Sequence, residues 1–236
     1  MGWLSGDWKE RVLHLLLPRT CGACGRDLPC TLQGPLCGPC LSGLELIRPP
    51  YCPRCGMAGR AQTSCRRCAS LPPATPVTRA AFRYRGPLPP LLHAFKYGGR
   101  LDAGRALGDW MAGAWRRHPE LGRPDALVPV PLHPARLAER GFNQARVLAE
   151  RVSSAAGAPV AELAARRRRT PPQAQRAREE RLGRMSGAFR AEPSARGLRL
   201  VLVDDAMTSG ETLAACASAL REAGAADVKA FVLTRA

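Results

Sequence analysis

The stretch RLVLVDDAMTSGET, from Arg199 to Thr212, constrains the fold of this chain more than any other segment. Leu200–Val203 has the length and β-branched content of a buried parallel strand, and Asp204 and Asp205 follow it at once. A loop rich in hydroxyl groups then ends in Gly210. A helix is expected after this glycine, because apolar residues recur on one stripe: Leu213, Cys216, Ala217 and Leu220. The stretch therefore predicts a strand–loop–helix unit of an α/β protein.

This predicted unit has the features of a sugar-phosphate site. Loop amides and a helix N-terminus point unpaired N–H groups and a partial positive charge at a phosphate. Gly210 permits close approach of the backbone, and three hydroxyl groups can add hydrogen bonds: Thr208, Ser209 and Thr212. Asp204 and Asp205 can accept hydrogen bonds from a vicinal diol. The alternative is an ordinary N-capped helix after a buried strand, but the complete string favours the sugar-phosphate site.

The segment VLVDDAMTSGET resembles the phosphoribosyl pyrophosphate (PRPP) signature of the type I phosphoribosyltransferases. Ser209 stands where a second threonine is more common in that signature, and serine keeps the hydroxyl group. The resemblance implies that Asp204 and Asp205 are the catalytic acids and hold the ribose hydroxyls. It also implies that the following residues bind PRPP around its 5′-phosphate: Ala206, Met207, Thr208, Ser209, Gly210, Glu211 and Thr212.

Nine of the ten cysteines lie before residue 70, and eight of them form four CxxC pairs. Each CxxC turn places two thiolates on one side of the backbone, so two turns complete a four-sulfur zinc site. Sequential pairing is the simplest assignment, and interleaved pairing is the alternative. A redox role is disfavoured, because four copies occur without a thioredoxin-like βαβ context. The sequence therefore predicts two structural zinc ions, held by Cys21, Cys24, Cys37, Cys40, Cys52, Cys55, Cys65 and Cys68.

Composition, the cysteine spacing and the resemblance to phosphoribosyltransferases divide the chain into three parts. Residues 1–19 are expected to form an amphipathic helix, residues 20–70 a double zinc ribbon, and residues 79–236 a phosphoribosyltransferase-like domain after a proline-rich connector. No run of eighteen apolar residues occurs, so no transmembrane segment is expected. The expected location is the cytoplasm. A peripheral position at the inner membrane face is the alternative, with the first helix lying on the membrane surface.

A second α/β unit is predicted around residues 126–155. The apolar run 126–131 leads into Leu132-His133-Pro134, and RLAERGFNQ then leads into a helix that runs through Ala155. The intervening loop would open at the same carboxyl edge of the sheet as residues 204–212. His133 could act as a base, although a lone histidine in a loop is more often a hydrogen-bonding or exposed side chain. By resemblance, this turn binds pyrophosphate through Pro131, Leu132, His133, Arg136 and Arg140.

Two basic segments could contact anions. Lys96 and Arg100 flank a pair of glycines, and a solvated basic turn is an equally good interpretation of them. Residues 166–185 hold eight arginines and two glutamates, a net charge of +6, which cannot be buried. We interpret this second segment as a lid over a pyrophosphate-bearing substrate, with Arg169 and Arg176 among its contacts. The alternatives are a segment that contacts the backbone of a nucleic acid and a solvated loop with no function.

Five motifs in the same order resemble the ComF family, including its competence and GntX-like members: FKYGGR, PVPLHPARLAERGFNQ, TPPQ, RMSGAF and VLVDDAMTSGET. The four CxxC pairs match the double-zinc-ribbon form of that family. The resemblance implies a Rossmann-like parallel sheet of four or five strands, binding of PRPP with Mg²⁺, and a role in natural competence and processing of incoming single-stranded DNA.

Two other functions are compatible with the sequence. A net charge of +17 also suits a non-catalytic nucleic-acid-binding adaptor that contacts single-stranded DNA or DNA-uptake proteins. A nucleobase salvage-type phosphoribosyltransferase is the other alternative. The acceptor substrate, turnover and the oligomeric state are left open by the sequence.

Overall fold

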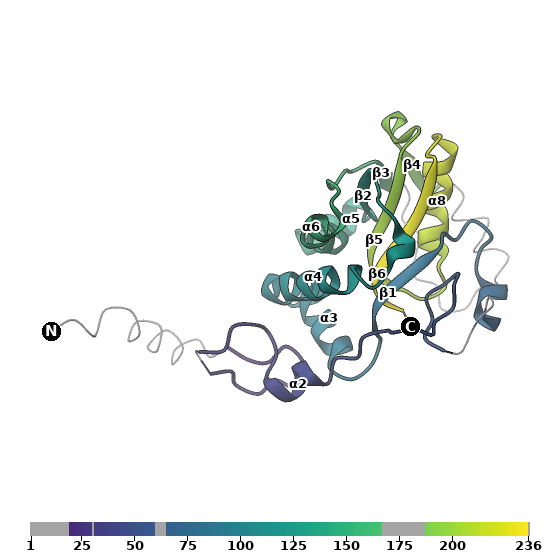
Figure 1. Cartoon of the computed structure of the whole chain (residues 1–236). Helices are drawn as coiled ribbons and strands as arrows, with labels where there is room; N and C mark the ends of the chain where they lie inside the picture. The colour runs from purple at the N-terminus through teal and green to yellow at the C-terminus, as the bar shows by residue number, and fades with distance from the viewer. Residues whose placement is uncertain (1–18, 30, 60–64, 167–186, 236) are drawn as a thin grey trace.

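The computed structural model describes residues 19–29, 31–59, 65–166 and 187–235. Its centre is a four-stranded parallel sheet with strand order β1-β6-β5-β2 (Figure 1). The strands are β1 (Thr78–Arg83), β2 (Ala126–Pro129), β5 (Arg199–Met207) and β6 (Asp227–Arg235). The expected parallel α/β sheet is thereby confirmed.

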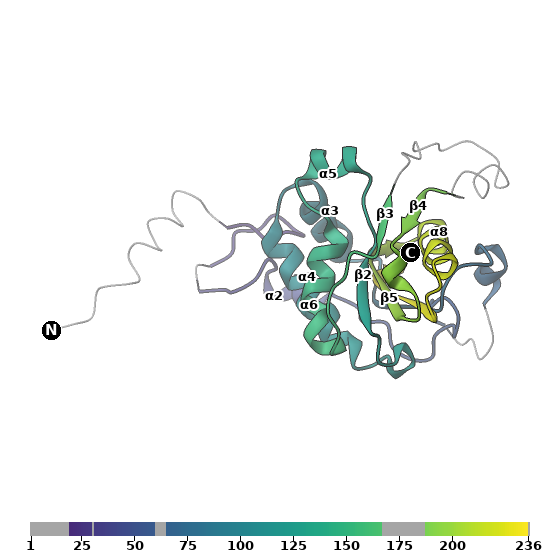
Figure 2. The same ribbon diagram turned by 90° about the horizontal axis from the view of Figure 1, so that it is seen from above.

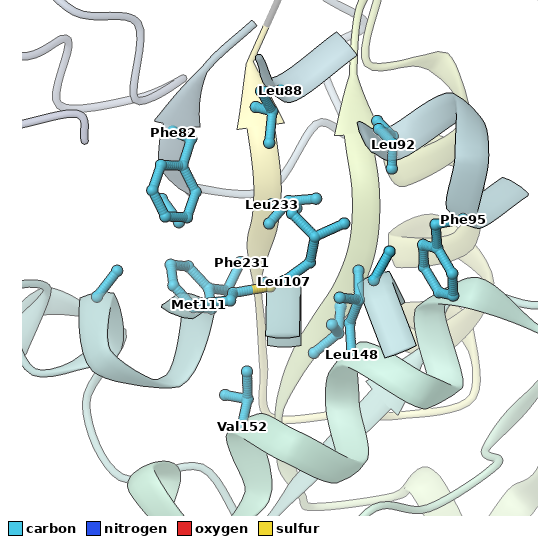
Figure 3. Close-up of a cluster of buried hydrophobic side chains, with 14 of the residues drawn as sticks. Phe82, Leu88, Leu92, Phe95, Leu107, Met111, Leu148, Val152, Phe231 and Leu233 are labelled. Carbon is cyan, nitrogen blue, oxygen red and sulfur yellow. The ribbon is translucent and has the colours of Figure 1, made fainter. Parts of the chain in front are cut away.

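Helices cover both faces of the sheet, and Figure 2 shows this layering from above. One face carries α3 (Leu88–Tyr97), α4 (Leu101–Trp115) and α6 (Gln144–Ala156), and the other carries α8 (Glu211–Glu222). Side chains of β5 alternate between the two layers. Val201 and Val203 join the cluster under α3, α4 and α6, whereas Leu200 and Leu202 join the cluster under α8. Figure 3 shows the first cluster, in which Phe231 and Leu233 of β6 meet Leu107, Met111 and Leu148.

Strand β5 is longer than its apolar run predicts. Asp204 and Asp205 still belong to the strand, and so do Ala206 and Met207, which the sequence assigned to the following loop. The reason is the neighbouring strand β6, whose Val232, Thr234 and Arg235 pair in register with Asp204, Ala206 and Met207. The sequence-based boundary was therefore wrong by four residues, because polar residues can extend a strand whose backbone has a partner.

Shorter elements complete the domain. The segment RLAERGFNQ contains its own helix, α5 (Pro134–Arg140), which Gly141 ends with a left-handed φ of 78° before α6 begins. Strands β3 (Ala164–Arg166) and β4 (Phe189–Ala191) form a separate antiparallel hairpin. The part of the chain that the structure describes also has three 3₁₀ turns, after Cys65, His118 and Glu192: η1 (Arg66–Ser70), η2 (Pro119–Leu121) and η3 (Pro193–Ala195). None of the helices among the described residues has the length and hydropathy needed to cross a bilayer.

Part of the cysteine-rich segment lies along the edge of the sheet. Its only regular α-helix among the described residues is α2 (Gly38–Ser42). Residues 45–47 run antiparallel along β1, where the Ile47 N–H donates to the Ala81 carbonyl and the Arg83 N–H to the Glu45 carbonyl. This segment therefore covers the exposed edge of β1. The helix expected at residues 1–19 lies almost wholly outside the described residues, as do Arg169 and Arg176 of the expected lid.

Candidate functional site

Two loops and the end of α3 meet at the carboxyl edge of the sheet. The end of β5 carries Asp204 and Asp205, and the end of β2 leads into residues 131–134. The two strand ends are joined by a hydrogen bond from the Val130 N–H to the Val203 carbonyl, 2.9 Å. Lys96, on the last turn of α3, reaches the same edge and forms an ion pair with Asp205. This is the edge at which open α/β sheets bind ligands.

The two aspartates lie in different electrostatic environments although they are adjacent. Asp204 accepts a hydrogen bond from the Asp205 N–H at 2.8 Å, while Asp205 accepts one from Lys96 Nζ at 2.7 Å. Burial, followed by the charge of Asp205, raises the pKa of Asp204 to about 8, and the charges of Lys96 and Arg166 oppose this rise. Both residues are half-buried, so the pair is accessible from the edge of the sheet. The structure thus brings together the pair that the sequence predicts.

The loop after β5 turns sharply into α8. Gly210 has a left-handed φ of 76° and occupies the N-cap position, so the first N–H groups of α8 face the loop without helical partners. Thr208 and Ser209 are exposed, and Glu211 and Thr212 are half-buried. Met207 is 1% exposed, so its side chain packs in the core beneath the loop.

Arg235 is a residue that sequence reasoning missed. It is 5% exposed, and its Nη1 donates to the Met207 carbonyl at 2.9 Å and also to the Thr208 carbonyl. The guanidinium therefore fixes the backbone at the start of the loop. Arg235 reaches the loop because it pairs with Met207 in the register of β5 and β6. The sequence does not show this register.

The turn at 131–134 is half-buried at Pro131, Leu132 and His133. His133 Nδ1 accepts a hydrogen bond from the Ala135 N–H at 3.2 Å, which makes His133 the N-cap of α5. Asn143, another residue that the sequence did not single out, donates to the Val130 carbonyl at 3.2 Å and caps α6. It therefore anchors the end of β2 to the start of α6.

Arg140 connects this turn to α3. Its guanidinium lies 4.8 Å from the centre of the Tyr97 ring and donates to Tyr97 Oη at 3.1 Å and to Gln144 Oε1 at 3.0 Å. Arg136 is half-buried nearby, and its charge adds to burial in lowering the pKa of Arg166. Arg100, by contrast, pairs with Asp102 and donates to the Thr20 carbonyl, so it supports the fold rather than the site. Of the two cations flanking the glycines, only Lys96 reaches the aspartates.

The eight CxxC cysteines form two clusters with sequential pairing. Cys21, Cys24, Cys37 and Cys40 make the first cluster and Cys52, Cys55, Cys65 and Cys68 the second, with the sulfur atoms of each within 4.8 Å of one another. Burial raises the pKa of Cys21, but backbone N–H groups of Cys24 and Cys37 outweigh it and bring the pKa down to about 6. Four converging sulfurs with N–H donors suit a tetrahedral zinc ion. The two clusters therefore fit two structural zinc ions.

Comparison with known proteins agrees with this architecture. A double zinc ribbon domain model matches residues 12–69, and a phosphoribosyl transferase domain model matches residues 138–236. DNA utilization protein YhgH of Salmonella typhi is 33% identical over 226 residues, which cover 94% of this chain and 99% of that protein. Competence protein ComFC of Bacillus subtilis is 31% identical over 85% of this chain and 84% of its own length.

Among solved structures, the glutamine PRPP amidotransferase of B. subtilis aligns with 59% of this chain and 30% of its own, at a TM-score of 0.40 and 20% identity. The near full-length likeness to YhgH and ComFC decides the family. With its double zinc ribbon and phosphoribosyltransferase domain, the chain belongs to the ComF family.

Proposed function

We propose that this protein binds PRPP together with Mg²⁺ at the carboxyl edge of the sheet. The observation that carries the proposal is the pair Asp204–Asp205 at the end of β5, followed within five residues by Gly210 and the N-terminus of α8. An acidic pair beside a glycine-bounded helix N-terminus combines acceptors for a vicinal diol with donors for a phosphate. Residues 206–212 would surround the 5′-phosphate, and the aspartates would accept from the ribose hydroxyls.

The opposite side of the site would hold the pyrophosphate group. Arg136 and Arg140 lie on α5, directly after the 131–134 turn, and both are half-buried rather than fully solvated. Arginines in this position can neutralise the charge of a departing pyrophosphate. Mg²⁺ would enter with PRPP, coordinated mainly by substrate and water oxygens.

The chemistry we propose is displacement at the anomeric carbon. The bond from this carbon to the pyrophosphate oxygen breaks, and pyrophosphate leaves with the electron pair. A lone pair of the acceptor forms the new bond, and the proton that the acceptor loses passes to the departing pyrophosphate or to water. Asp204 and Asp205 would steady the ribose while positive charge develops on it. With His133 Nδ1 engaged in the cap of α5, no protein base is assigned to this step.

The names of two relatives support a role in DNA handling. YhgH is named a DNA utilization protein and ComFC a competence protein. We infer that this protein acts in the uptake or processing of incoming single-stranded DNA. The net charge of +17 supports a second candidate, a non-catalytic adaptor that binds nucleic acid. Such binding would weaken steeply with salt and select little for sequence.

Isothermal titration calorimetry with PRPP and Mg²⁺ tests the proposal. We expect binding by the wild type and loss of binding in Asp204→Asn/Asp205→Asn. Asp109→Asn is the matched control, because Asp109 is an exposed aspartate paired with Arg151 on the helical face. Absence of heat with the wild type, or equal affinity in the double variant, would overturn the proposal. Binding of single-stranded DNA without any PRPP binding would leave the adaptor.

A further inference from the structure

The second cysteine cluster and the loop at 206–212 share one continuous apolar cluster. Its buried members extend from the cysteine turns to the first turn of α8: Cys52, Cys55, Cys68, Leu71, Met207 and Leu213. The link between them is the connector at residues 71–77, which leaves η1 and enters β1. Packing therefore couples a predicted zinc site to a predicted phosphate loop.

Two connector side chains lie against Gly210. A Cβ atom on Gly210 would stand 3.2 Å from Leu71 Cδ2 and 3.5 Å from Thr75 Cγ2, and 2.7 Å from Met207 Cε. Leu71 and Thr75 are 7% and 6% exposed. The backbone at Gly210 is thus enclosed by the connector and by Met207. Because interiors pack densely, moving Leu71 would release this backbone and the N–H groups of α8 next to it.

Hydrogen bonds fasten the connector at both ends. Arg54, inside the turn between Cys52 and Cys55, donates to the carbonyls of Cys68 and Pro72, both at 3.4 Å. From the other side, Arg221 of α8 donates to the Ala74 carbonyl at 2.7 Å. Hydrogen bonds therefore link the connector to the cysteine turn on one side and to α8 on the other.

The first cysteine cluster packs elsewhere. Cys21, Leu28 and Leu36 are buried with Leu88 and Leu91 of α3. A Cβ atom on Gly22 would stand only 2.7 Å from Leu91 Cδ1. This cluster borders the helix that carries Lys96, not the loop that carries Gly210.

We propose that the second cysteine cluster braces the phosphate loop, with Leu71 and Thr75 as positioning residues for the 5′-phosphate. The inference rests on the proposed function. It adds that the second cysteine cluster supports the phosphate loop and the first does not. The Leu71 N–H donates to the Cys68 carbonyl at 3.2 Å, so ligation of Cys68 would set the place of Leu71. Affinity for the 5′-phosphate then depends on the second cluster, whereas affinity for pyrophosphate does not.

Two fragments of PRPP separate these subsites in a binding experiment on the full chain. Ribose 5-phosphate probes the loop at 206–212, and pyrophosphate with Mg²⁺ probes the 131–134 turn. In Leu71→Ala we expect the Kd for ribose 5-phosphate to rise about tenfold and the Kd for pyrophosphate to change less than about twofold. Leu71→Met keeps the side-chain volume and should restore ribose 5-phosphate binding.

Leu121→Ala is the matched control, since Leu121 is 3% exposed and packs in the other cluster near the amino edge of β2. It should lower the unfolding midpoint without changing either Kd. If Leu71→Ala does not fold, Thr75→Ser removes a single methyl group facing Gly210 and should weaken ribose 5-phosphate binding alone. An unchanged Kd for ribose 5-phosphate, or an equal loss for both fragments, overturns the inference. A wild type that binds neither fragment removes the proposed function itself.

Discussion

Lys96 and Asp205, which are 109 positions apart in the sequence, form an ion pair with 2.7 Å between Nζ and Oδ1. Their side chains are only 20% and 13% exposed. A lysine with this little exposure neutralises the charge of Asp205 beside Asp204 and holds Asp205 at the edge of the sheet. In the ligand-bound state the same cation would lie beside the ribose hydroxyls or the pyrophosphate.

We expect Lys96→Ala to weaken PRPP binding about tenfold, because Asp205 loses its neutralising partner and the site loses a positive charge. Lys96→Arg keeps the charge and should bind within a few-fold of the wild type. Calorimetric titration with PRPP and Mg²⁺ measures both. Arg100→Ala is the comparison from the same glycine turn, and its PRPP affinity should not change. Equal PRPP affinities in Lys96→Ala and the wild type would show that the ion pair between Lys96 and Asp205 contributes to stability and not to PRPP binding.

Asp204 makes stability depend on pH. Its pKa in the folded state, raised to about 8 by burial and by Asp205, exceeds the ordinary value near 3.9. As pH rises, the unfolded state therefore loses this proton at a lower pH than the folded state does. The stability contributed by protonated Asp204 is complete below about pH 4 and is lost as pH rises toward 8. Asp204→Asn, which stays neutral, should match the wild type near pH 4 and exceed its unfolding free energy at pH 8.

Urea unfolding at several pH values between 4 and 8 measures this difference. The same variant should fail to bind PRPP, so stability and binding would change in opposite directions. A variant that is less stable than the wild type at pH 8 would show that Asp204 is ionised and well solvated in the folded protein.

The sequence predicted those parts of the site that lie close together along the chain. The order of apolar run, acids, hydroxyl-rich loop and helix is local, and it placed Asp204, Asp205 and Gly210 at one strand end. The CxxC spacing likewise predicted the cysteine turns, because two thiolates three residues apart must face the same side of a tight turn. Parallel strands then bring the 131–134 turn to the same edge.

Individual side-chain contacts between distant segments were not predictable from the sequence. Nothing local in FKYGGR distinguishes Lys96, which reaches Asp205, from Arg100, which reaches Asp102 and Thr20. The position of Arg235 under the loop follows from the register of β5 and β6. These contacts depend on strand order and helix packing, which side-chain patterns along one segment do not specify.

We expect two zinc ions per folded chain. Removal of the metal should lower the unfolding midpoint of the protein. Of the eight hydrophobic side chains buried among the described residues between 19 and 70, five are cysteines, so we expect metal binding to contribute much of the folding free energy of this segment. Cys24→Ser and Cys65→Ser should each reduce zinc to about one equivalent, because each removes a ligand from a different four-sulfur cluster. Metal analysis and thermal unfolding measure both effects. A zinc-free chain with an unchanged unfolding midpoint would refute structural zinc.

Glu120 in η2 links the segment around the second cysteine cluster to β1, because both Tyr51 and Arg79 donate hydrogen bonds to its carboxylate. It accepts a hydrogen bond from Tyr51 Oη at 2.7 Å and pairs with Arg79, which is 5% exposed on β1. Burial raises the pKa of Glu120, but these two donors outweigh it and bring the pKa down to about 2. This contribution to stability is complete above the ordinary glutamate pKa near 4.3 and is lost as pH falls toward 2.

Glu120→Gln should therefore lower the unfolding free energy by about 1–3 kcal/mol at neutral pH, since it leaves Arg79 buried without its carboxylate. The difference from the wild type should shrink as the pH is lowered from about 5 toward 2, where the wild-type carboxylate also becomes neutral. Glu150→Gln, from an exposed pair with Arg146, is the control and should change stability little at any pH. If Glu120→Gln lost the same free energy at every pH, the effect would come from packing, and the carboxylate charge would contribute nothing to the attachment of the cysteine segment.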